Sequence, residues 1–354
     1  MLDAQLEKKL AAGERLTRQE CENIYRHASH DDLKKWATLA KSRFHTTDSA
    51  TYLIMAIVNY TNICVAKCDY CSFYKLPHQE GTYHLSDSEI FAKLDTLLAH
   101  GGTMVGFNGG FHPKLKIIDY AKLFQKVRHR YGDDLQFYGM TVAEFMFSAK
   151  LSKMPYVEAA TVLKDHGTEW VTGGGAEILD DDFRMRHSPG KFKVDDYFKA
   201  QQAILTVGMG STATMVIGFD ETLEERFNHL EKLRDFQDAN KHWPLTSFLC
   251  WTYKPYNNEL GGAEISSEEY WRWLAVSRLY LDNIKHIRTS VLTKNQDALV
   301  GLQYGANDFD LPTEDEVTQK AGATIEKDFA GILQSARDLG IEPIHRAPFK
   351  RVVQ

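Results

Sequence analysis

The strongest constraint on the fold is a regular alternation of strand-like and helix-like segments between residues 51 and 310. Residues 51–60 are rich in β-branched and aromatic side chains, which is typical of a buried strand. Residues 86–102 have helix signals, with Ser86 at the capping position and Glu89 three residues later. Further strands are expected at 103–110, 135–140, 168–175, 211–218, 245–255, 287–292 and 303–308, with helical segments such as 116–132, 141–166 and 194–208 between them. The order makes about eight strand–helix units.

Strands that alternate with helices at this spacing predict a parallel sheet with right-handed crossovers. Eight such units predict an α/β fold, a (β/α)8 barrel of the TIM type, with its functional groups at the carboxyl ends of the strands. Helical patterns also precede and follow these units. We therefore expect an N-terminal helical extension over residues 1–49, a barrel over 50–312, and a C-terminal helical segment packed on the barrel over 313–354.

Charge and hydropathy narrow the range of partners. The net charge is -6 and no long basic run occurs, which argues against a nucleic-acid groove as the main site. No apolar run approaches the ~20 residues that a membrane helix needs. The N-terminus is polar and has no apolar signal core, so we expect a cytoplasmic protein without a membrane or nucleic-acid partner.

Three of the five cysteines lie in the loop that follows the first expected strand, as Cys64, Cys68 and Cys71, with the spacing C-x3-C-x2-C. Buried small residues are one reading of such a cluster. A structural zinc site wants four ligands and would need a histidine such as His78. A 4Fe–4S cluster also usually has four thiolates, so three would leave one iron open to a substrate or cofactor. A disulfide framework is not expected in a chain of this size with so few cysteines.

This loop, placed directly after the first strand of an expected barrel, resembles that of the radical S-adenosylmethionine enzymes. The resemblance implies that the three cysteines hold a 4Fe–4S cluster whose fourth iron chelates the amino and carboxylate groups of S-adenosylmethionine. Transfer of one electron would then cleave the sulfonium and yield a 5′-deoxyadenosyl radical. Tyr70 matches the superfamily's aromatic position beside the adenine, with a packing role as the alternative.

The stretch "FNGGFHP" resembles the superfamily's glycine-rich turn after the second strand. The resemblance implies that Asn108, Gly109 and Gly110 contact the methionyl ammonium of the cofactor. Glycine permits such an approach because it lacks a Cβ. A tight turn with no ligand would also favour glycines.

Several stretches in order, including "GGGAEIL", "STATMVIGFDETLEER" and "WTYKPYNNELG", resemble the menaquinone and deazaflavin branch of that superfamily, and most closely its dehypoxanthine futalosine cyclases. The chain departs from the cyclase pattern at three places. Asn108 stands where glutamine is usual, "RTSVLTKN" lacks the usual tryptophan and glutamine, and the run after Asp308 differs. The last two departures concern the half of the barrel that would shape the substrate.

The resemblance implies a reaction. The radical would remove the C4′ hydrogen from the ribose of dehypoxanthine futalosine. The sugar radical would then add to the substrate's own benzoate ring, and loss of an electron and a proton would restore aromaticity. An external one-electron donor such as flavodoxin or ferredoxin is implied. The alternatives are aminofutalosine synthase, another deazaflavin-type radical synthase, or a zinc-binding or electron-transfer module without a substrate.

Further polar and aromatic residues lie near the expected barrel mouth. Glu177 is expected to bind cofactor or substrate hydroxyl groups and to take part in catalysis, and Asp308, expected to end the eighth strand, is a candidate base. The candidates for substrate binding are Arg184, Arg186, His78 and Trp251, and Tyr138 is a candidate for the cofactor site. Arginine suits a benzoate carboxylate because its guanidinium pairs with both oxygens. For each of these side chains, packing or a solvated surface position is the alternative.

Overall fold

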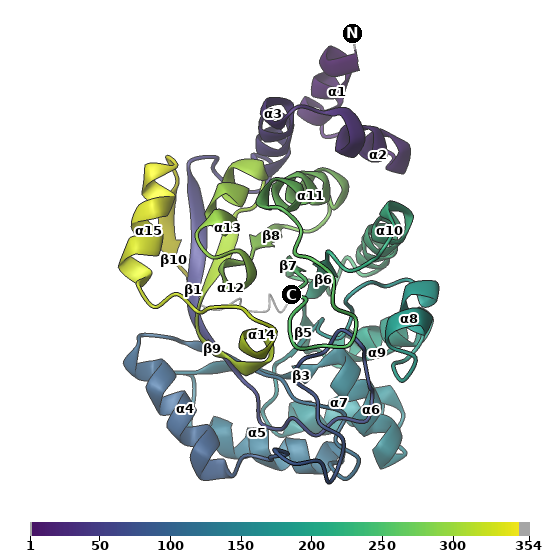
Figure 1. The fold of residues 1–354 in the computed structure, drawn as a ribbon, viewed down its shortest axis with the longest axis vertical. Coiled ribbons are helices and arrows are strands. Elements are labelled where there is room, and N and C mark those ends of the chain that lie inside the picture. Colours follow the sequence, from purple (N-terminus) through teal and green to yellow (C-terminus); the bar gives the residue numbers. More distant parts are fainter. Residues whose placement is uncertain (1, 347–354) are drawn as a thin grey trace.

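Parallel strands form the centre of the computed structural model, which describes residues 2–346 (Figure 1). The strands are β1 (Ser49–Val58), β2 (Met104–Phe107), β3 (Gln136–Thr141), β4 (Trp170–Thr172), β5 (Gly210–Ser211), β6 (Ala213–Ile217), β7 (Ser247–Thr252), β8 (His286–Thr289), β9 (Asp308–Asp315) and β10 (Glu342–His345). Their order in the sheet is β5-β4-β3-β2-β1-β9-β8-β7-β6, with β10 beside β1, and these neighbours pair in parallel.

The sheet is an almost closed barrel. Strand β5 pairs with β4 and strand β6 pairs with β7, and only Thr212 separates β5 from β6 in the chain. The two short strands therefore act as one interrupted strand, which gives eight strand positions around the barrel. The expected (β/α)8 fold is confirmed.

Helices surround the strands in the order that the sequence predicts (Figure 1). They are α4 (Asp87–Ala99), α5 (Ile117–Tyr131), α6 (Val142–Ser152), α7 (Tyr156–Asp165), α8 (Asp181–His187), α9 (Val194–Thr206), α10 (Leu223–Ala239) and α11 (Ser267–Tyr280), followed by the short helices α12 (Val291–Lys294), α13 (Asp297–Val300) and η1 (Gly301–Tyr304). Their apolar faces pack on the outside of the strands, as Phe124 of α5 does against Phe107 and Phe137. None of the helices within residues 2–346 is both long and apolar enough to cross a bilayer.

Three helices precede the barrel, α1 (Leu2–Ala11), α2 (Arg18–His27) and α3 (His30–Lys41). Helices α2 and α3 pack against α11, so they extend the helical layer at one end of the molecule (Figure 1). Residue 1 and residues 347–354, which are the ends of the first and last expected segments, lie outside the described residues.

The structure corrects three expected boundaries. Residues 141–166 form two helices, because Pro155 separates α6 from α7. The stretch 303–308 is a turn of 3-10 helix and a left-handed Gly305, and the last barrel strand begins only at Asp308. The segment after residue 312 is not only helical: it contains the end of β9, then α14 (Glu316–Lys320), α15 (Phe329–Asp338) and the strand β10, which pairs with β1.

Candidate active site

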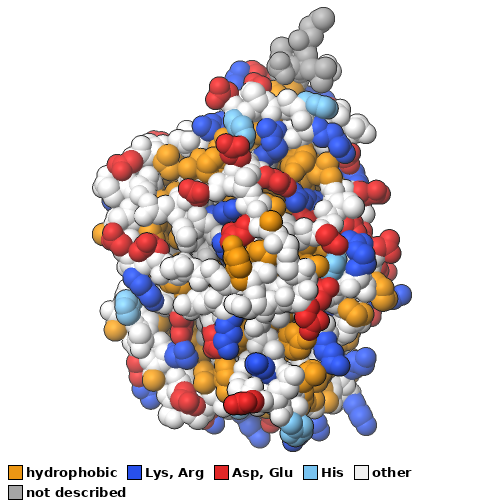
Figure 2. All heavy atoms as spheres, in the orientation of Figure 1, with side chains coloured by type: hydrophobic (Ala, Val, Ile, Leu, Met, Phe, Trp, Pro, Cys, Tyr) orange, Lys and Arg blue, Asp and Glu red, His pale blue; other side chains and the backbone are white. Residues whose placement is uncertain are grey.

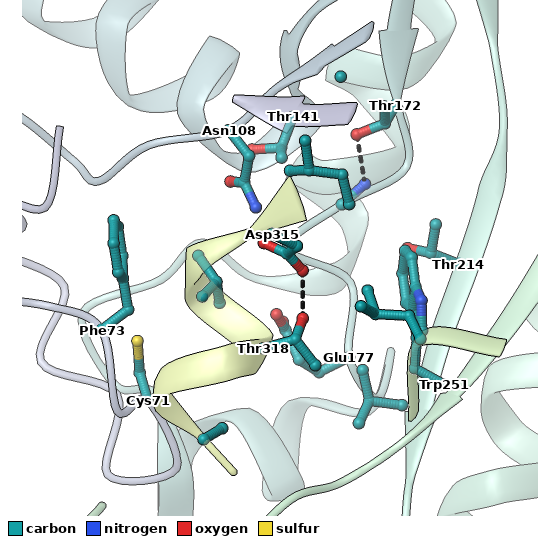
Figure 3. Close-up of a pocket in the computed structure, with 18 of the residues that line it drawn as sticks. Cys71, Phe73, Asn108, Thr141, Thr172, Glu177, Thr214, Trp251, Asp315 and Thr318 are labelled. Atoms are coloured by element: carbon teal, nitrogen blue, oxygen red, sulfur yellow. Dashed lines mark hydrogen bonds between the residues drawn. The ribbon is translucent and has the colours of Figure 1, made fainter. Parts of the chain in front are cut away.

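A cavity of about 340 Å³ opens at the carboxyl ends of the strands and continues into the barrel. Residues from the cysteine loop, from the loops after β2 and β4, and from strands β7 to β9 line it. Figure 3 shows Cys71, Glu177 and Trp251 pointing into the same space from different elements. Figure 2 shows hydrophobic side chains near the middle of this face and charged side chains scattered over all of it. The site therefore lies where a barrel of this type carries its functional groups.

All three clustered cysteines line this cavity. The loop that carries them is held by backbone hydrogen bonds, from Cys64 N to Lys75 O at 2.9 Å and from Cys71 N to Cys68 O at 3.1 Å. All three are free thiols, and burial raises the pKa of each, that of Cys68 to about 12. A thiolate here would need a compensating cation, which iron supplies.

A zinc ion was the alternative to a cluster. In the part of the chain that the structure describes, no group of three or more His, Cys, Asp or Glu side chains could hold one metal ion. A zinc site needs that convergence, whereas in an iron–sulfur cluster each thiolate binds a different iron. His78, the possible fourth zinc ligand, is exposed and does not line the cavity.

The glycine-rich turn after β2 packs directly against the cysteine loop. A Cβ on Gly110 would lie 2.3 Å from Ile63 O and 2.6 Å from the Cβ of Cys64. The Gly109 amide donates to Glu144 Oε1 at 2.8 Å, and Asn108 and Gly109 line the cavity. Only glycine at position 110 lets the two loops approach this closely.

A buried ion pair lies beside the cysteine loop. Lys191 Nζ donates to Glu177 Oε2 at 2.6 Å and to the Tyr70 hydroxyl at 3.1 Å, and all three residues line the cavity. Burial lowers the pKa of Lys191, but the charge of Glu177, its hydrogen bond and the nearby Cys68 together raise the pKa by more, so the net shift is upward and the ammonium stays charged. Glu177 has a φ of 39°, in the left-handed region that residues other than glycine rarely adopt. The sequence had indicated Glu177 and Tyr70 but not Lys191.

The opposite wall and the deep end of the cavity come from later strands. Trp251 and Tyr138 line it as expected from the sequence. Arg288 of β8 and Asp310 of β9 form an ion pair at the same surface, and Asp315 lies at the carboxyl end of β9. Burial raises the pKa of Asp315 to about 6. The sequence signal for the last three residues was weak, because they fall in the two stretches that depart from the cyclase pattern.

Four candidate residues are placed elsewhere. Arg184 is buried and donates to the carbonyls of Phe192, Gly175 and Ala176, so it shapes the loop after β4 and does not line the cavity. Arg186 lies outside the cavity and pairs with Glu225 at 2.7 Å. The structure therefore does not bring these two arginines or His78 into the cavity, and their substrate contacts stay a prediction.

Asp308 was expected at the carboxyl end of a strand, but it is the first residue of β9. It is fully buried and forms ion pairs with Arg288 at 3.0 Å and with Arg346 at 2.5 Å. These cations outweigh burial and lower the pKa of its carboxyl. Asp308 does not line the cavity, and its position in this ion-pair cluster favours a structural role over its predicted role as a base.

A barrel with three cysteines in one loop at its mouth defines an iron–sulfur barrel enzyme. Comparison with known proteins is consistent with this class. Residues 58–233 match the model of the radical SAM superfamily, and residues 245–351 match the CofH/MqnC C-terminal region. The chain therefore belongs to the radical SAM superfamily, in the branch that carries this C-terminal region, and its cofactors are a 4Fe–4S cluster and S-adenosylmethionine.

Two curated relatives are similar to this chain in sequence, and one solved structure is similar to it in fold. A cyclic dehypoxanthine futalosine synthase of Halalkalibacterium halodurans is 34% identical over 97% of this chain and 92% of its own length. An aminodeoxyfutalosine synthase of Thermus thermophilus is 30% identical over 89% of this chain and 86% of its own. The structure of methylornithine synthase aligns with a TM-score of 0.72 at 17% identity, over 96% of this chain and 97% of that one, which supports the fold alone.

Proposed function

We propose that this enzyme converts dehypoxanthine futalosine to its cyclic product in the futalosine route to menaquinone. The observation that supports the proposal best is one cavity that connects three cysteine thiols to a barrel interior holding the Arg288–Asp310 ion pair, in a chain similar to a cyclic dehypoxanthine futalosine synthase over nearly its whole length. The proposal includes a cytoplasmic location and an external one-electron donor such as flavodoxin or ferredoxin.

Cys64, Cys68 and Cys71 would hold the cluster, which together with S-adenosylmethionine supplies a primary carbon radical when both are bound. The Lys191 ammonium suits the carboxylate of the cofactor, and the loop after β2 offers backbone groups to its ammonium. Glu177 and Tyr70 lie on the same side of the cavity, where they suit the ribose and the adenine ring.

Neighbouring loops and a helix form walls around the site, which would help to keep water from a reactive radical. The loop after β7 is bonded to the cysteine loop: Glu259 N and Leu260 N donate to Asp69 O at 2.8 and 3.0 Å, and Ser72 Oγ donates to Tyr256 O at 2.6 Å. Helix α14 adds a further wall, since Val317 and Thr318 line the cavity. These contacts hold a substrate close to the radical source, which the low selectivity of a primary radical requires.

Atoms and electrons balance in the proposed reaction. With one electron from the external donor, S-adenosylmethionine would supply the deoxyadenosyl carbon radical and release methionine as its sulfur–carbon bond breaks. The C4′–H bond of the ribose would then break, and its hydrogen would form a C–H bond in 5′-deoxyadenosine. The C4′ radical forms a carbon–carbon bond to the benzoate ring. The adduct then gives one electron to a one-electron acceptor of the iron–sulfur type and one proton to a base, which restores aromaticity.

Substrate deuterated at C4′ tests this proposal. Anaerobic, reduced enzyme is expected to release 5′-deoxyadenosine that carries the label, together with a product two hydrogens lighter than the substrate. Unlabelled 5′-deoxyadenosine formed at the same rate with and without substrate would contradict the proposal. Mass spectrometry of both products gives the answer.

A second function has support from the relative of Thermus thermophilus that is named aminodeoxyfutalosine synthase. An enzyme of that kind would join the deoxyadenosyl group to an enolpyruvyl benzoate, so its product would retain the adenosyl carbon skeleton. Incubation with each substrate separates the two functions, since only the synthase would form such an adduct.

A further inference from the structure

The barrel interior contains an ion pair that the proposed reaction does not yet use. Along β9 the side chains alternate: Phe309 and Leu311 pack outward with Ile332 of α15, whereas Asp310 faces the cavity. Arg288 of the neighbouring strand β8 also lines the cavity, and its Nη2 donates to Asp310 Oδ1. Two charged side chains from adjacent strands therefore present their ends to the same internal space.

Each member of this pair retains an unused polar atom. Arg288 donates through Nε to Asp308 and through Nη2 to Asp310, which leaves Nη1 without a hydrogen-bond partner within residues 2–346. Asp310 Oδ2 has no partner there either. Neither atom is among the fully enclosed polar atoms, and 6% of the Arg288 side chain and 16% of the Asp310 side chain remain accessible. One donor and one acceptor thus reach the cavity beside each other.

The charges around the pair decide which kind of group fits it. Two arginines, Arg288 and Arg346, face two aspartates, Asp308 and Asp310, so the cluster is balanced when all four are charged. A carboxylate would add an uncompensated charge in a buried place and would lie against the open oxygen of Asp310. A neutral group that both donates and accepts hydrogen bonds meets neither penalty.

We propose that Arg288 and Asp310 bind the ribose hydroxyl groups of the substrate and so determine its orientation in the barrel. Asp310 Oδ2 accepts from one hydroxyl, and Arg288 Nη1 donates to the oxygen of the same or the adjacent hydroxyl. The inference rests on the proposed function, because it takes dehypoxanthine futalosine as the substrate. It assigns a specificity role to the two stretches in which the chain departs from the cyclase pattern.

Binding without turnover tests the assignment. The full-length, cluster-loaded protein is first saturated with S-adenosylmethionine, and no reductant is added. Calorimetry then measures the binding of dehypoxanthine futalosine and of three analogues. Two analogues each lack one ribose hydroxyl, at C2′ or at C3′, and the third has a benzamide in place of the benzoate. Asp310→Asn keeps an oxygen for Arg288 but can place a donor where Oδ2 was. We expect this variant to bind the parent compound about 10- to 100-fold more weakly.

A hydrogen bond to a ribose hydroxyl predicts that the variant loses affinity for the parent compound but not for the analogue that lacks that hydroxyl. A variant that is damaged in general would lose affinity for every probe. At least one deoxy analogue is expected to bind Asp310→Asn and wild-type protein equally, because the lost hydroxyl and the lost acceptor belong to one hydrogen bond. Glu314→Gln is the matched control: it changes a carboxylate on the same strand that pairs outside the cavity with Lys93. This control is expected to bind all probes like wild type.

Arg288→Lys provides a second variant that keeps a positive charge beside Asp308, should Asp310→Asn fold poorly as judged by iron content and melting temperature. The same coupling is expected for it. Equal losses for the deoxy analogues in wild type and in the variants would overturn the inference, and so would a coupling confined to the benzamide probe. Failure of the wild-type protein to bind the parent compound would instead overturn the proposed function, and the hydroxyl assignment with it.

Discussion

Surroundings, more than burial, distinguish the cysteines at the residue scale. Cys68 and Cys250 are 6% and 0% exposed, and burial raises the pKa of both thiols. Only Cys68 lines the cavity, whereas Cys250 donates to Trp251 O within β7 and faces the outer core. The spacing in the sequence places the two cysteines in different elements, because it reports membership of one loop.

Replacement of Cys68 by alanine is expected to abolish cluster binding, since two thiolates cannot hold the cluster as three do. The measurement is iron per chain after anaerobic reconstitution, supported by the visible absorption spectrum. Cys250→Ala is the control and should keep its iron, because the residue does not line the cavity. Iron retained in Cys68→Ala would contradict the assignment.

Asp315 gives a prediction about pH. Burial raises the pKa of its carboxyl to about 6 from an ordinary 3.8, and its Oδ1 has no partner within residues 2–346. The folded state therefore holds a proton that the unfolded chain releases, and this stabilisation is lost as the pH rises from about 4 to about 6. The loss amounts to about 2–3 kcal/mol.

Asp315→Asn removes the titrating group and keeps an acceptor for Thr318 Oγ1, which donates to Asp315 Oδ2. Its unfolding free energy is expected to exceed that of wild type at pH 8, and the difference should shrink toward pH 4.5. Urea unfolding at several pH values measures this trend. The control Asp133→Asn changes a fully exposed carboxylate and should show no such trend. The assignment would be disproved if the wild-type unfolding free energy rose between pH 4.5 and 7 relative to that of Asp315→Asn.

At the scale of elements, the sequence predicted helices and strands correctly where the local capping and strand-forming residues agree with the tertiary packing. The capping box of Ser86 and Glu89 forms as expected at the start of α4. The segment 303–308 failed because its aromatic and small residues suit a strand, whereas Gly305 adopts a φ of 88° and ends a helical turn. Because of that error, Asp308 was expected at the end of a strand, where a catalytic base would lie, although it is the first residue of β9.

The residues that the sequence missed share one property: their role depends on partners far along the chain. Lys191 is significant because Glu177 and Tyr70 come to it from two other loops. Arg288 and Asp310 are separated by 22 positions and meet only through the pairing of β8 with β9. A period or a motif reports neighbours in sequence, so it could not identify these contacts. For Arg288 and Asp310, the sequence offered one indication: both lie in stretches that depart from the cyclase pattern.

Gly110 tests the packing of the two loops that form the cluster site. An alanine Cβ there would meet Ile63 O at 2.3 Å, a backbone atom that cannot move without displacing the cysteine loop. Gly110→Ala is therefore expected to lower iron content at least severalfold. Gly106→Ala, where the nearest atom would lie at 3.9 Å, should load normally. Equal iron in both variants would mean that the loops do not need this close approach.

For the whole molecule, the buried cluster around Asp308 connects distant parts of the chain. Asp308 accepts from Thr51 of β1, Arg288 of β8 and Arg346 just after β10. Strand β10 itself pairs with β1, and α15 covers the same side of the barrel with Ile332 fully buried. The start of β1 and the C-terminal segment with β10 thus meet at the amino end of the barrel, opposite the cavity mouth, and the ion pairs join this segment to the strands.

Asp308→Asn is expected to destabilise the protein by about 3 kcal/mol, because the change leaves buried arginine charge without its partner. Equilibrium urea unfolding gives the value, and Glu314→Gln, which breaks the more exposed pair with Lys93, should cost less than about 1 kcal/mol. A double-mutant cycle of Asp308→Asn and Arg346→Gln should give an interaction free energy of about 1–3 kcal/mol, since the two residues share hydrogen bonds. Because Asp308 does not line the cavity, folded Asp308→Asn protein should still release 5′-deoxyadenosine when reduced and supplied with substrate. Unchanged stability together with lost turnover would restore Asp308 as a catalytic candidate and would contradict a structural role for its ion pairs.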